Sequence, residues 1–282
     1  MDQLTSEEKK ILEELKRYQE TVTGEYGMVS VEGLSYVNYA TDTLIMGSMY
    51  NTGKNWACDD MLRFYELSRE YYPSKAGRGL FFDIGANIGT TSIYFKKKID
   101  KDIQIIAFEP SDKNYKMLDI NMRLNDIDGE DFCLEKIALS DHEGECAFSY
   151  DEYNSGGSGL VFEKSSCNET MVKTISLDQY VVKNSIDVSK IKYFWVDIEG
   201  AEPLFLRGAE KTIKESAAPM VMEFSPAKYK ANGEYMNCVD LLCHLFDSFI
   251  YMHDDNKNIH PIDVLYRYED AVQQVDLFLI RG

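Results

Sequence analysis

The two commonest phosphate-binding signatures are missing from this sequence. No GxxxxGK[ST] loop occurs in its 282 residues, and the glycine turn at residues 85–89 lacks the GxGxxG spacing. Both signatures place phosphate groups against backbone N–H groups at the N-terminus of a helix. Their absence disfavours ATP and NAD as cofactors.

Zinc-site spacing is also missing. The six cysteines include no CxxC pair, and none has histidines near it at the spacing of a zinc site. We therefore expect reduced, mostly buried thiols, which are Cys58, Cys133, Cys146, Cys167, Cys238 and Cys243.

Long apolar runs and basic runs are absent as well. The first ten residues lack the apolar core of a signal peptide, and no later run approaches membrane length. These absences predict a cytoplasmic protein that does not enter a membrane. The formal charge is -18, from 48 acidic and 30 basic residues. A chain this acidic repels nucleic acids and anionic membrane surfaces, so neither is an expected partner.

The most informative part of the sequence is residues 80–110. Residues 80–84 predict a buried strand, the glycine turn predicts the start of a helix, and residues 105–108 predict a second strand that ends at Glu109. This order is a βαβ unit, the nucleotide-binding half of an α/β sheet.

Two carboxylates in this unit indicate which nucleotide it binds. Asp83 stands just before the glycine turn, where it suits a ligand with a cationic group, such as the ammonium and sulfonium of S-adenosylmethionine. Glu109 can accept hydrogen bonds from both hydroxyls of a ribose, and Pro110 then stops the strand. The alternatives are a helix cap for Asp83 and a solvated loop residue for Glu109.

Motifs along more than half of the chain resemble those of FkbM-type methyltransferases in order and spacing. The resemblance implies a class I methyltransferase fold, S-adenosylmethionine as the methyl donor, and a hydroxyl of a sugar or natural product as the acceptor. The motifs are residues 83–89 (DIGANIG), 108–110 (FEP), 138–141 (ALSD) with Gly144, 176–178 (SLD) and 196–202 (VDIEGAE).

The predicted architecture is α/β: a Rossmann-like, doubly wound, mostly parallel sheet with an antiparallel C-terminal strand pair. Residues 1–75 form a helical and extended cap, and residues 76–282 form the cofactor-binding domain. Within the cap, Thr5 and Glu8 form a possible capping box for a helix. The other expected elements are strands at 28–31, 35–39, 132–137, 219–222, 248–252 and 275–280, and helices at 59–72, 111–125 and 236–246.

The resemblance also extends the cofactor site to the end of the third strand. Leu139 and Asp141 follow that strand where this fold meets the adenine, so Asp141 could accept a hydrogen bond from the adenine amino group. An acid in a surface turn is an equal alternative. The predicted cofactor-binding residues are Asp83, Gly85, Asn87, Gly89, Glu109, Pro110, Leu139 and Asp141.

Acidic residues follow two later strands and are the predicted catalytic residues. Asp197 and Glu199 come directly after the apolar residues 193–196, and Glu223 follows residues 219–222. Ligands of parallel sheets bind at these strand ends. The carboxylates could orient and activate the acceptor hydroxyl, or hold a divalent cation, which is the less favoured option. Glu202 could instead complement the helix macrodipole, and Glu223 could be a structural acid.

An insertion at residues 148–174 contains the flexible segment 154–159. Tyr150, Tyr153 and Phe162 flank this segment, and one of the tyrosines could supply a face for stacking on a sugar, although a disordered surface excursion is the slightly favoured alternative for any one residue. His253 and His260 could approach the acidic residues from the C-terminal part, but lone loop histidines are more often solvated.

The sequence therefore predicts an S-adenosylmethionine-dependent O-methyltransferase that acts on a carbohydrate or secondary metabolite. An NAD-dependent oxidoreductase on a similar sheet and a non-catalytic binding protein on the same scaffold are the alternatives. The oligomeric state and the identity of the acceptor stay open.

Overall fold

The computed structural model describes residues 24–72, 78–127, 129–151, 153–160 and 169–281. The expected capping box at Thr5 and Glu8, the side chains of Phe162 and Cys167, and the predicted domain boundary at 75/76 lie outside these residues. No helix within the described ranges is long and apolar enough to cross a membrane.

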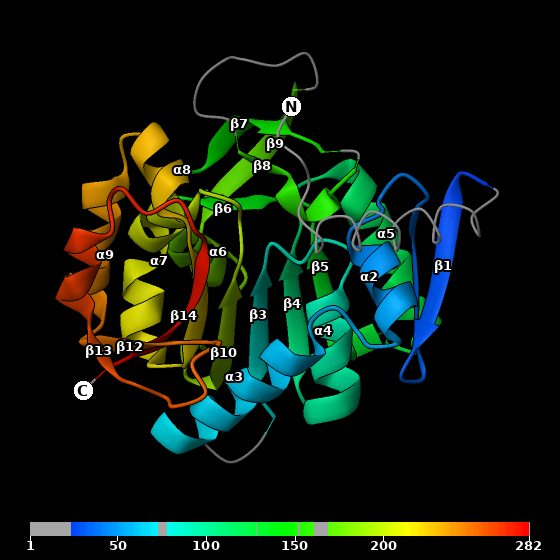
Figure 1. Cartoon of the computed structure of the whole chain (residues 1–282), viewed down its shortest axis with the longest axis horizontal. Coiled ribbons are helices and arrows are strands. Elements are labelled where there is room, and N and C mark those ends of the chain that lie inside the picture. The colour runs from blue at the N-terminus through cyan, green and yellow to red at the C-terminus, as the bar shows by residue number, and fades with distance from the viewer. Residues whose placement is uncertain (1–23, 73–77, 128, 152, 161–168, 282) are drawn as a thin grey trace, which may run out of the picture.

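An eight-stranded sheet forms the centre of the fold (Figure 1). The five strands β11, β10, β3, β4 and β5 run parallel, and β14 pairs antiparallel with both β11 and β12. The predicted doubly wound sheet with an antiparallel C-terminal pair is therefore confirmed. In spatial order the strands are β13 (His260–Pro261), β12 (Ser248–Tyr251), β14 (Val275–Ile280), β11 (Met220–Phe224), β10 (Ile191–Val196), β3 (Leu80–Ile84), β4 (Gln104–Phe108) and β5 (Phe132–Glu135).

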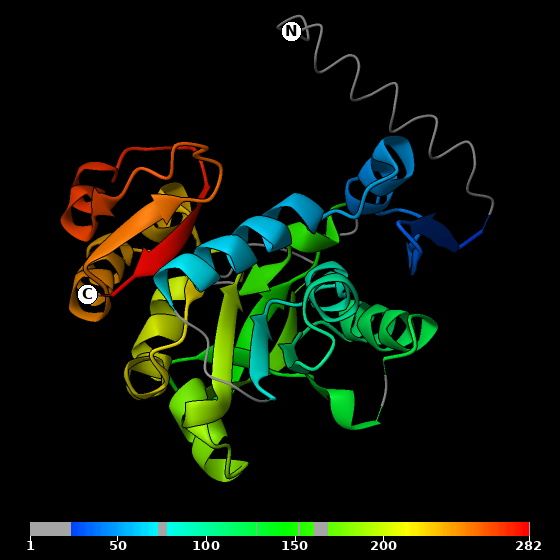
Figure 2. The same cartoon turned by 90° about the horizontal axis from the view of Figure 1, so that it is seen from below.

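Helices cover both faces of this sheet because its strands bury both of their sides. Successive residues of β3 show the division: Phe81 packs into the core on one face and Phe82 into the core on the other. Helices α3 (Cys58–Tyr71), α4 (Thr90–Tyr94) and α5 (Asp112–Leu124) cover the first face, which Figure 2 shows with α3 lying across it. Helices α6 (Leu177–Lys183), α7 (Glu202–Ser216) and α9 (Tyr235–Leu245) cover the second.

Within the described residues, the insertion after β5 is more ordered than its sequence predicts. Its flanks form a second sheet in the order β6 (Ala138–Ser140), β9 (Glu169–Ser176), β7 (Gly144–Ser149) and β8 (Gly159–Leu160). Ala138, Phe148 and Val172 form its small apolar core. The pairing of β7 with β9 joins residues that are 20 to 30 positions apart, a long-range contact that local turn signals do not reveal.

The N-terminal part packs on the same body through two asparagines, Asn121 of α5 and Asn125, the residue that caps its C-terminus. A hairpin of β1 (Tyr26–Val31) and β2 (Leu34–Tyr39) precedes α2 (Ile45–Thr52). Asn121 accepts from the backbone N–H of Val37 at 2.7 Å and donates to its carbonyl at 3.0 Å, and Asn125 does the same with Ser35 at 3.0 and 2.7 Å. These amides satisfy the exposed edge of β2 as a neighbouring strand would.

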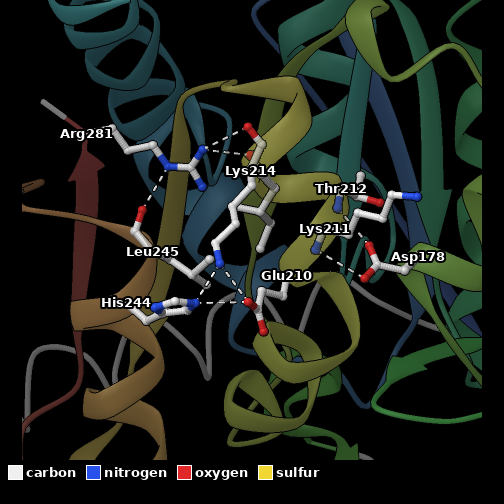
Figure 3. Close-up of polar contacts among 9 residues, drawn as sticks. Asp178, Glu210, Lys211, Thr212, Lys214, His244, Leu245 and Arg281 are labelled. Carbon is white, nitrogen blue, oxygen red and sulfur yellow. Dashed lines mark hydrogen bonds and ion pairs between the residues drawn. The ribbon is translucent and has the colours of Figure 1, made fainter.

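Helix α7 is tied to elements on both sides, as Figure 3 shows. Asp178 accepts hydrogen bonds from the backbone N–H groups of Lys211 and Thr212 at 3.2 and 2.7 Å. On the other side, Arg281 of the last strand end donates to the carbonyls of Ile213 and Leu245 at 2.9 and 2.8 Å. These contacts hold the C-terminal part of α7 (Glu202–Ser216) to its neighbouring elements.

The packing of α7 on β6 requires glycine at position 208. A Cβ atom there would lie 2.0 Å from the carbonyl oxygen of Ser140, which is backbone and cannot swing aside. We expect Gly208→Ala to lower the free energy of unfolding by about 2–3 kcal/mol, because overpacking forces the helix away from the strand. Urea denaturation measures this change. The exposed Glu215→Ala on the same helix is the control, and an equally small effect of both substitutions would contradict the prediction.

Candidate active site

A cavity opens at the carboxyl ends of β3, β4, β10 and β11. Four carboxylates line it, and the described residues of its wall include no lysine, arginine or histidine. The rest of the wall is apolar or neutral, with two tryptophans, Trp56 and Trp195. The four carboxylates belong to Glu109, Asp197, Glu199 and Glu223.

The glycine turn after β3 lies directly against the turn after β10. Gly85 has a φ of +89°, and a Cβ atom there would come within 1.8 Å of the carbonyl oxygen of Asp197. The N–H of Asp197 donates to the carbonyl of Ile84 at 3.0 Å. Gly89, with a φ of +90°, leaves room for the Leu118 side chain of α5, 2.6 Å from where its Cβ would stand. Only glycine meets both the backbone conformation and the close approach at these positions.

Glu109 is almost completely buried and is held by the backbone. It accepts hydrogen bonds from the N–H groups of Asn87 and Ser111 at 2.9 and 2.8 Å. Burial raises its pKa to about 7, against these two hydrogen bonds. Glu109, Pro110, Gly85 and Asn87 all line the cavity, and their role in cofactor binding stays a prediction.

Asp83 lies beneath the cavity and is not part of its wall. It is fully buried, and one of its carboxylate oxygens accepts a hydrogen bond from the Ser92 hydroxyl. The other oxygen has no hydrogen-bond partner among the described residues. Burial raises the pKa of Asp83 to about 7. Its expected contact with a ligand cation stays a prediction.

Only one of the two residues that the sequence predicts near the adenine lies in the described cavity wall. Leu139 lines the cavity. The Asp141 carboxylate instead pairs with Arg207 of α7 at 2.9 Å and with His142 at 2.6 Å, and it lies outside the described wall of the cavity. The adenine contact of Asp141 stays a prediction, and this geometry favours the surface-acid alternative.

The three predicted catalytic carboxylates come together. One oxygen each from Asp197, Glu199 and Glu223 lies within 4.8 Å of the other two. Burial raises the pKa of Asp197 well above its usual range, and the charge of Glu223 adds to the shift. Burial also raises the pKa of Glu223 to about 8, with the charge of Glu202 as the next cause. The cluster therefore holds protons near neutral pH.

Lys228, which sequence reasoning missed, supplies a positive charge beside Glu199. It lies on α8 (Pro226–Ala231), and its ammonium group pairs with the Glu199 carboxylate. Burial lowers the pKa of Lys228. No local pattern links the two residues, because the pairing depends on how α8 packs after β11.

Glu202 has a structural role. It is fully buried and accepts hydrogen bonds from the N–H groups of Ile198 and Gly200, both at 3.0 Å. These bonds hold the turn that carries Glu199, so the alternative of a helix N-terminal structural acid describes Glu202. Glu223 differs, because it lines the cavity while accepting from the Ser225 hydroxyl at 3.0 Å.

The described part of the insertion forms a roof over the cavity. Ser155 donates through its N–H to Asp42 at 3.2 Å, and its hydroxyl donates to the same carboxylate. A Cβ at Gly159 would lie 3.1 Å from Glu199, which shows that the roof reaches the acidic cluster. Leu44, Ile45 and Trp56 from the N-terminal part complete the wall.

The tyrosines and histidines considered from the sequence lie elsewhere. Tyr153 is 70% exposed, and neither it nor Tyr150 lines the cavity. His253 lies between Asp60 and Asp276 at 3.7 and 3.9 Å, and outside the described cavity wall. The stacking role of the tyrosines stays a prediction, whereas Trp56 and Trp195 were not anticipated.

Known proteins share parts of this sequence and architecture. Methyltransferase sdnD of Sordaria araneosa is 29% identical over 168 residues, which cover 50% of this chain and 64% of that protein. The crystal structure of methyltransferase FkbM from Methylobacillus flagellatus KT aligns with 96% of this chain and 59% of its own, at 12% identity and a TM-score of 0.45. The SAM-dependent methyltransferase from Agrobacterium tumefaciens aligns over 92% and 70%, at 8% identity and a TM-score of 0.44. The matched regions thus span less than two thirds of the first two proteins.

The family assignment rests on a longer match. Residues 83–256, more than half of the chain, match the family model of the methyltransferase FkbM domain. This stretch includes the glycine turn, Glu109 and the acidic cluster. The chain belongs to the FkbM methyltransferase family.

Proposed function

We propose that this protein transfers a methyl group from S-adenosylmethionine to a hydroxyl of a carbohydrate or secondary metabolite. The acidic groups of the cavity carry the proposal: four carboxyl groups line it, a ligand cation would favour their ionised form, and the described wall has no basic side chain to bind an anion. S-adenosylmethionine brings ammonium and sulfonium cations, whereas NAD brings an anionic pyrophosphate. Such a wall attracts the first ligand and repels the second.

The residues around the glycine turn fit this cofactor, which supplies an electrophilic methyl group when bound. Glu109 would accept from the ribose hydroxyls, since each carboxylate oxygen keeps a free lone pair beside its backbone hydrogen bond. The Asn87 side-chain carbonyl is buried without a partner and could accept from a ligand donor. Gly85 keeps the backbone bare where the ligand would approach.

The acidic cluster would serve the acceptor. Methyl transfer requires the acceptor oxygen in line with the methyl carbon, so the carboxylates must both orient the hydroxyl and receive its proton. The raised pKa of Asp197 makes its carboxylate a stronger base than an ordinary aspartate, which suits a proton acceptor. Trp56, which is 45% exposed and lines the cavity, offers a flat face for a ring of the acceptor.

A divalent cation is the less favoured way to use the same carboxylates. Asp197, Glu199 and Glu223 are close enough to share one ion, and oxygen ligands suit magnesium. Lys228 already provides a positive charge at Glu199, however. We therefore favour a metal-independent reaction, in which the Lys228 ammonium group pairs with the Glu199 carboxylate.

Calorimetry with S-adenosylmethionine, S-adenosylhomocysteine and NAD, each with and without magnesium, tests the cofactor. We expect saturable binding of the first two only, independent of magnesium. Binding of NAD would favour an oxidoreductase, and no binding would favour a non-catalytic binding protein. Radiolabelled S-adenosylmethionine with a panel of saccharides and hydroxylated metabolites then identifies an acceptor.

Glu109→Gln tests the ribose assignment. The substitution removes the charge of an acceptor that would bond the ribose, so we expect S-adenosylhomocysteine to bind about 10- to 100-fold more weakly. Calorimetry measures the change. Glu135→Gln is the matched control, because Glu135 ends the neighbouring strand β5 and lies outside the described cavity wall. Unchanged affinity in Glu109→Gln would refute the assignment.

Asp197→Asn tests the acceptor side. We expect the turnover number with an identified acceptor to fall at least about 100-fold, while affinity for S-adenosylhomocysteine changes little, because a general base acts on the chemical step. The exposed Asp59→Asn is the control. Activity should also persist after treatment with EDTA; its loss, with recovery on adding magnesium, would establish the metal alternative.

Glu223→Gln tests the electrostatic cost of the cluster. The pKa of Glu223 rises from 4.5 to about 8 on folding, so its stabilising contribution is complete below pH 4.5 and is lost as the pH rises through about 8. Relative to wild type, Glu223→Gln should be more stable at pH 8.5 by about 1 kcal/mol or more, and nearly equal at pH 5. Urea denaturation at both pH values measures this difference. A stability difference that does not change with pH, as expected for the exposed Glu215→Gln, would show that burial does not raise the pKa of Glu223.

A further inference from the structure

Asn114 has an unsatisfied carbonyl in the wall of the cavity. It lies in the first turn of α5 with only 2% of its surface exposed, and it lines the cavity with Glu109. Its side-chain NH₂ group donates to the carbonyl of Ser155 at 3.3 Å. Its side-chain oxygen is buried and has no partner among the described residues. A buried acceptor in a ligand cavity, left unpaired by the protein, points to a donor on the ligand.

The orientation of the Asn114 amide follows from its partner. If the amide were turned over, its oxygen would face the Ser155 carbonyl, and two acceptors would oppose each other. The NH₂ group therefore faces the roof, and the oxygen is the atom left for a ligand. No local sequence motif predicts this role, because Asn114 and Ser155 are 41 residues apart in the chain.

Asn114 and Glu109 occupy the same part of the cavity. A hydrogen bond that the Asn114 NH₂ group donates to Glu109 is one of the causes that hold down the pKa of Glu109 against the larger effect of burial, and it fits the orientation of the amide given above. A ribose carries two adjacent hydroxyls, each of which donates one hydrogen bond. Two neighbouring acceptors, one charged and one neutral, match this pair of donors.

We propose that Asn114 binds the cofactor ribose together with Glu109, each accepting from one of the two hydroxyls. This inference rests on the proposed function, since it takes S-adenosylmethionine as the ligand. Ser155 is a positioning residue, because its carbonyl fixes the Asn114 amide. Asp42 in turn holds Ser155 through two hydrogen bonds, so the N-terminal part supports the ribose site from a distance.

Removing ligand hydroxyls and the Asn114 amide in combination tests the proposal. Calorimetry would compare S-adenosylhomocysteine with its 2′-deoxy and 3′-deoxy analogues, using wild type, Asn114→Ala and Glu109→Gln. We expect Asn114→Ala to bind S-adenosylhomocysteine about 10-fold more weakly than wild type does. For one of the two deoxy analogues, the variant and wild type should have the same affinity. For the other deoxy analogue, Glu109→Gln and wild type should have the same affinity.

Controls separate this role from a structural one. Asn125→Ala removes a comparable buried amide from the same helix region, away from the cavity, and should leave affinity within about twofold of wild type. Asn114→Leu keeps the branched shape and the number of side-chain heavy atoms, so it answers the question if Asn114→Ala does not fold. A Ser155→Ala variant keeps the backbone carbonyl but loses one bond to Asp42, and should weaken binding less than Asn114→Ala.

Two results would overturn the proposal. One is unchanged affinity in both Asn114 variants; the other is an equal loss for S-adenosylhomocysteine and both deoxy analogues, as a structural role or a bound water would produce. If wild type itself binds no S-adenosylhomocysteine, the proposed function fails instead. The two failures are thus distinguishable in one set of titrations.

Discussion

The site depends on the close approach of two backbone turns. The turn after β3 and the turn after β10 lie back to back, with Gly85 against the Asp197 carbonyl, because their strands are parallel neighbours in the sheet. A side chain at position 85 would push the turns apart. The glycine turn with its proposed cofactor contacts would then separate from the acidic cluster that would hold the acceptor. The transfer geometry of the proposed reaction is therefore set by the backbone first and by side chains second.

The acids at this edge of the sheet differ in whether hydrogen bonds from the backbone stabilise their carboxylates. Both oxygens of Glu202 accept backbone hydrogen bonds, so the carboxylate is fully used in holding a turn. Asp197 and Glu223 lie close to each other, so their negative charges repel. The charge of Lys228 lowers the pKa of Asp197, but burial and the neighbouring acids raise it more. A fold retains such mutual repulsion where function requires it, and stability elsewhere offsets the loss. This contrast separates structural from functional acids better than their sequence context does.

Local sequence predicted the sheet and most strand-end residues because their signals are contiguous. The apolar run of β3, its glycine turn and Glu109 lie within one βαβ unit, and the strand-end rule brings Asp197 to the same edge. Asn114 and Lys228 were missed because their partners are 41 and 29 residues away and meet only through tertiary packing. The same reason explains Asp141: an arginine of α7, 66 residues on, pairs with it outside the cavity. Sequence thus predicted the cavity floor but not its roof.

The roof has a consequence for how the protein folds. The Asp42–Ser155 contact joins residues separated by 113 positions, across β3, β4 and β5. Contacts at such a separation carry a large loop-closure entropy and form after local ones. A folding intermediate could therefore have an assembled sheet and an open, unroofed cavity. Cofactor affinity, measured as a function of refolding time, would then report the last step of folding rather than the formation of the sheet.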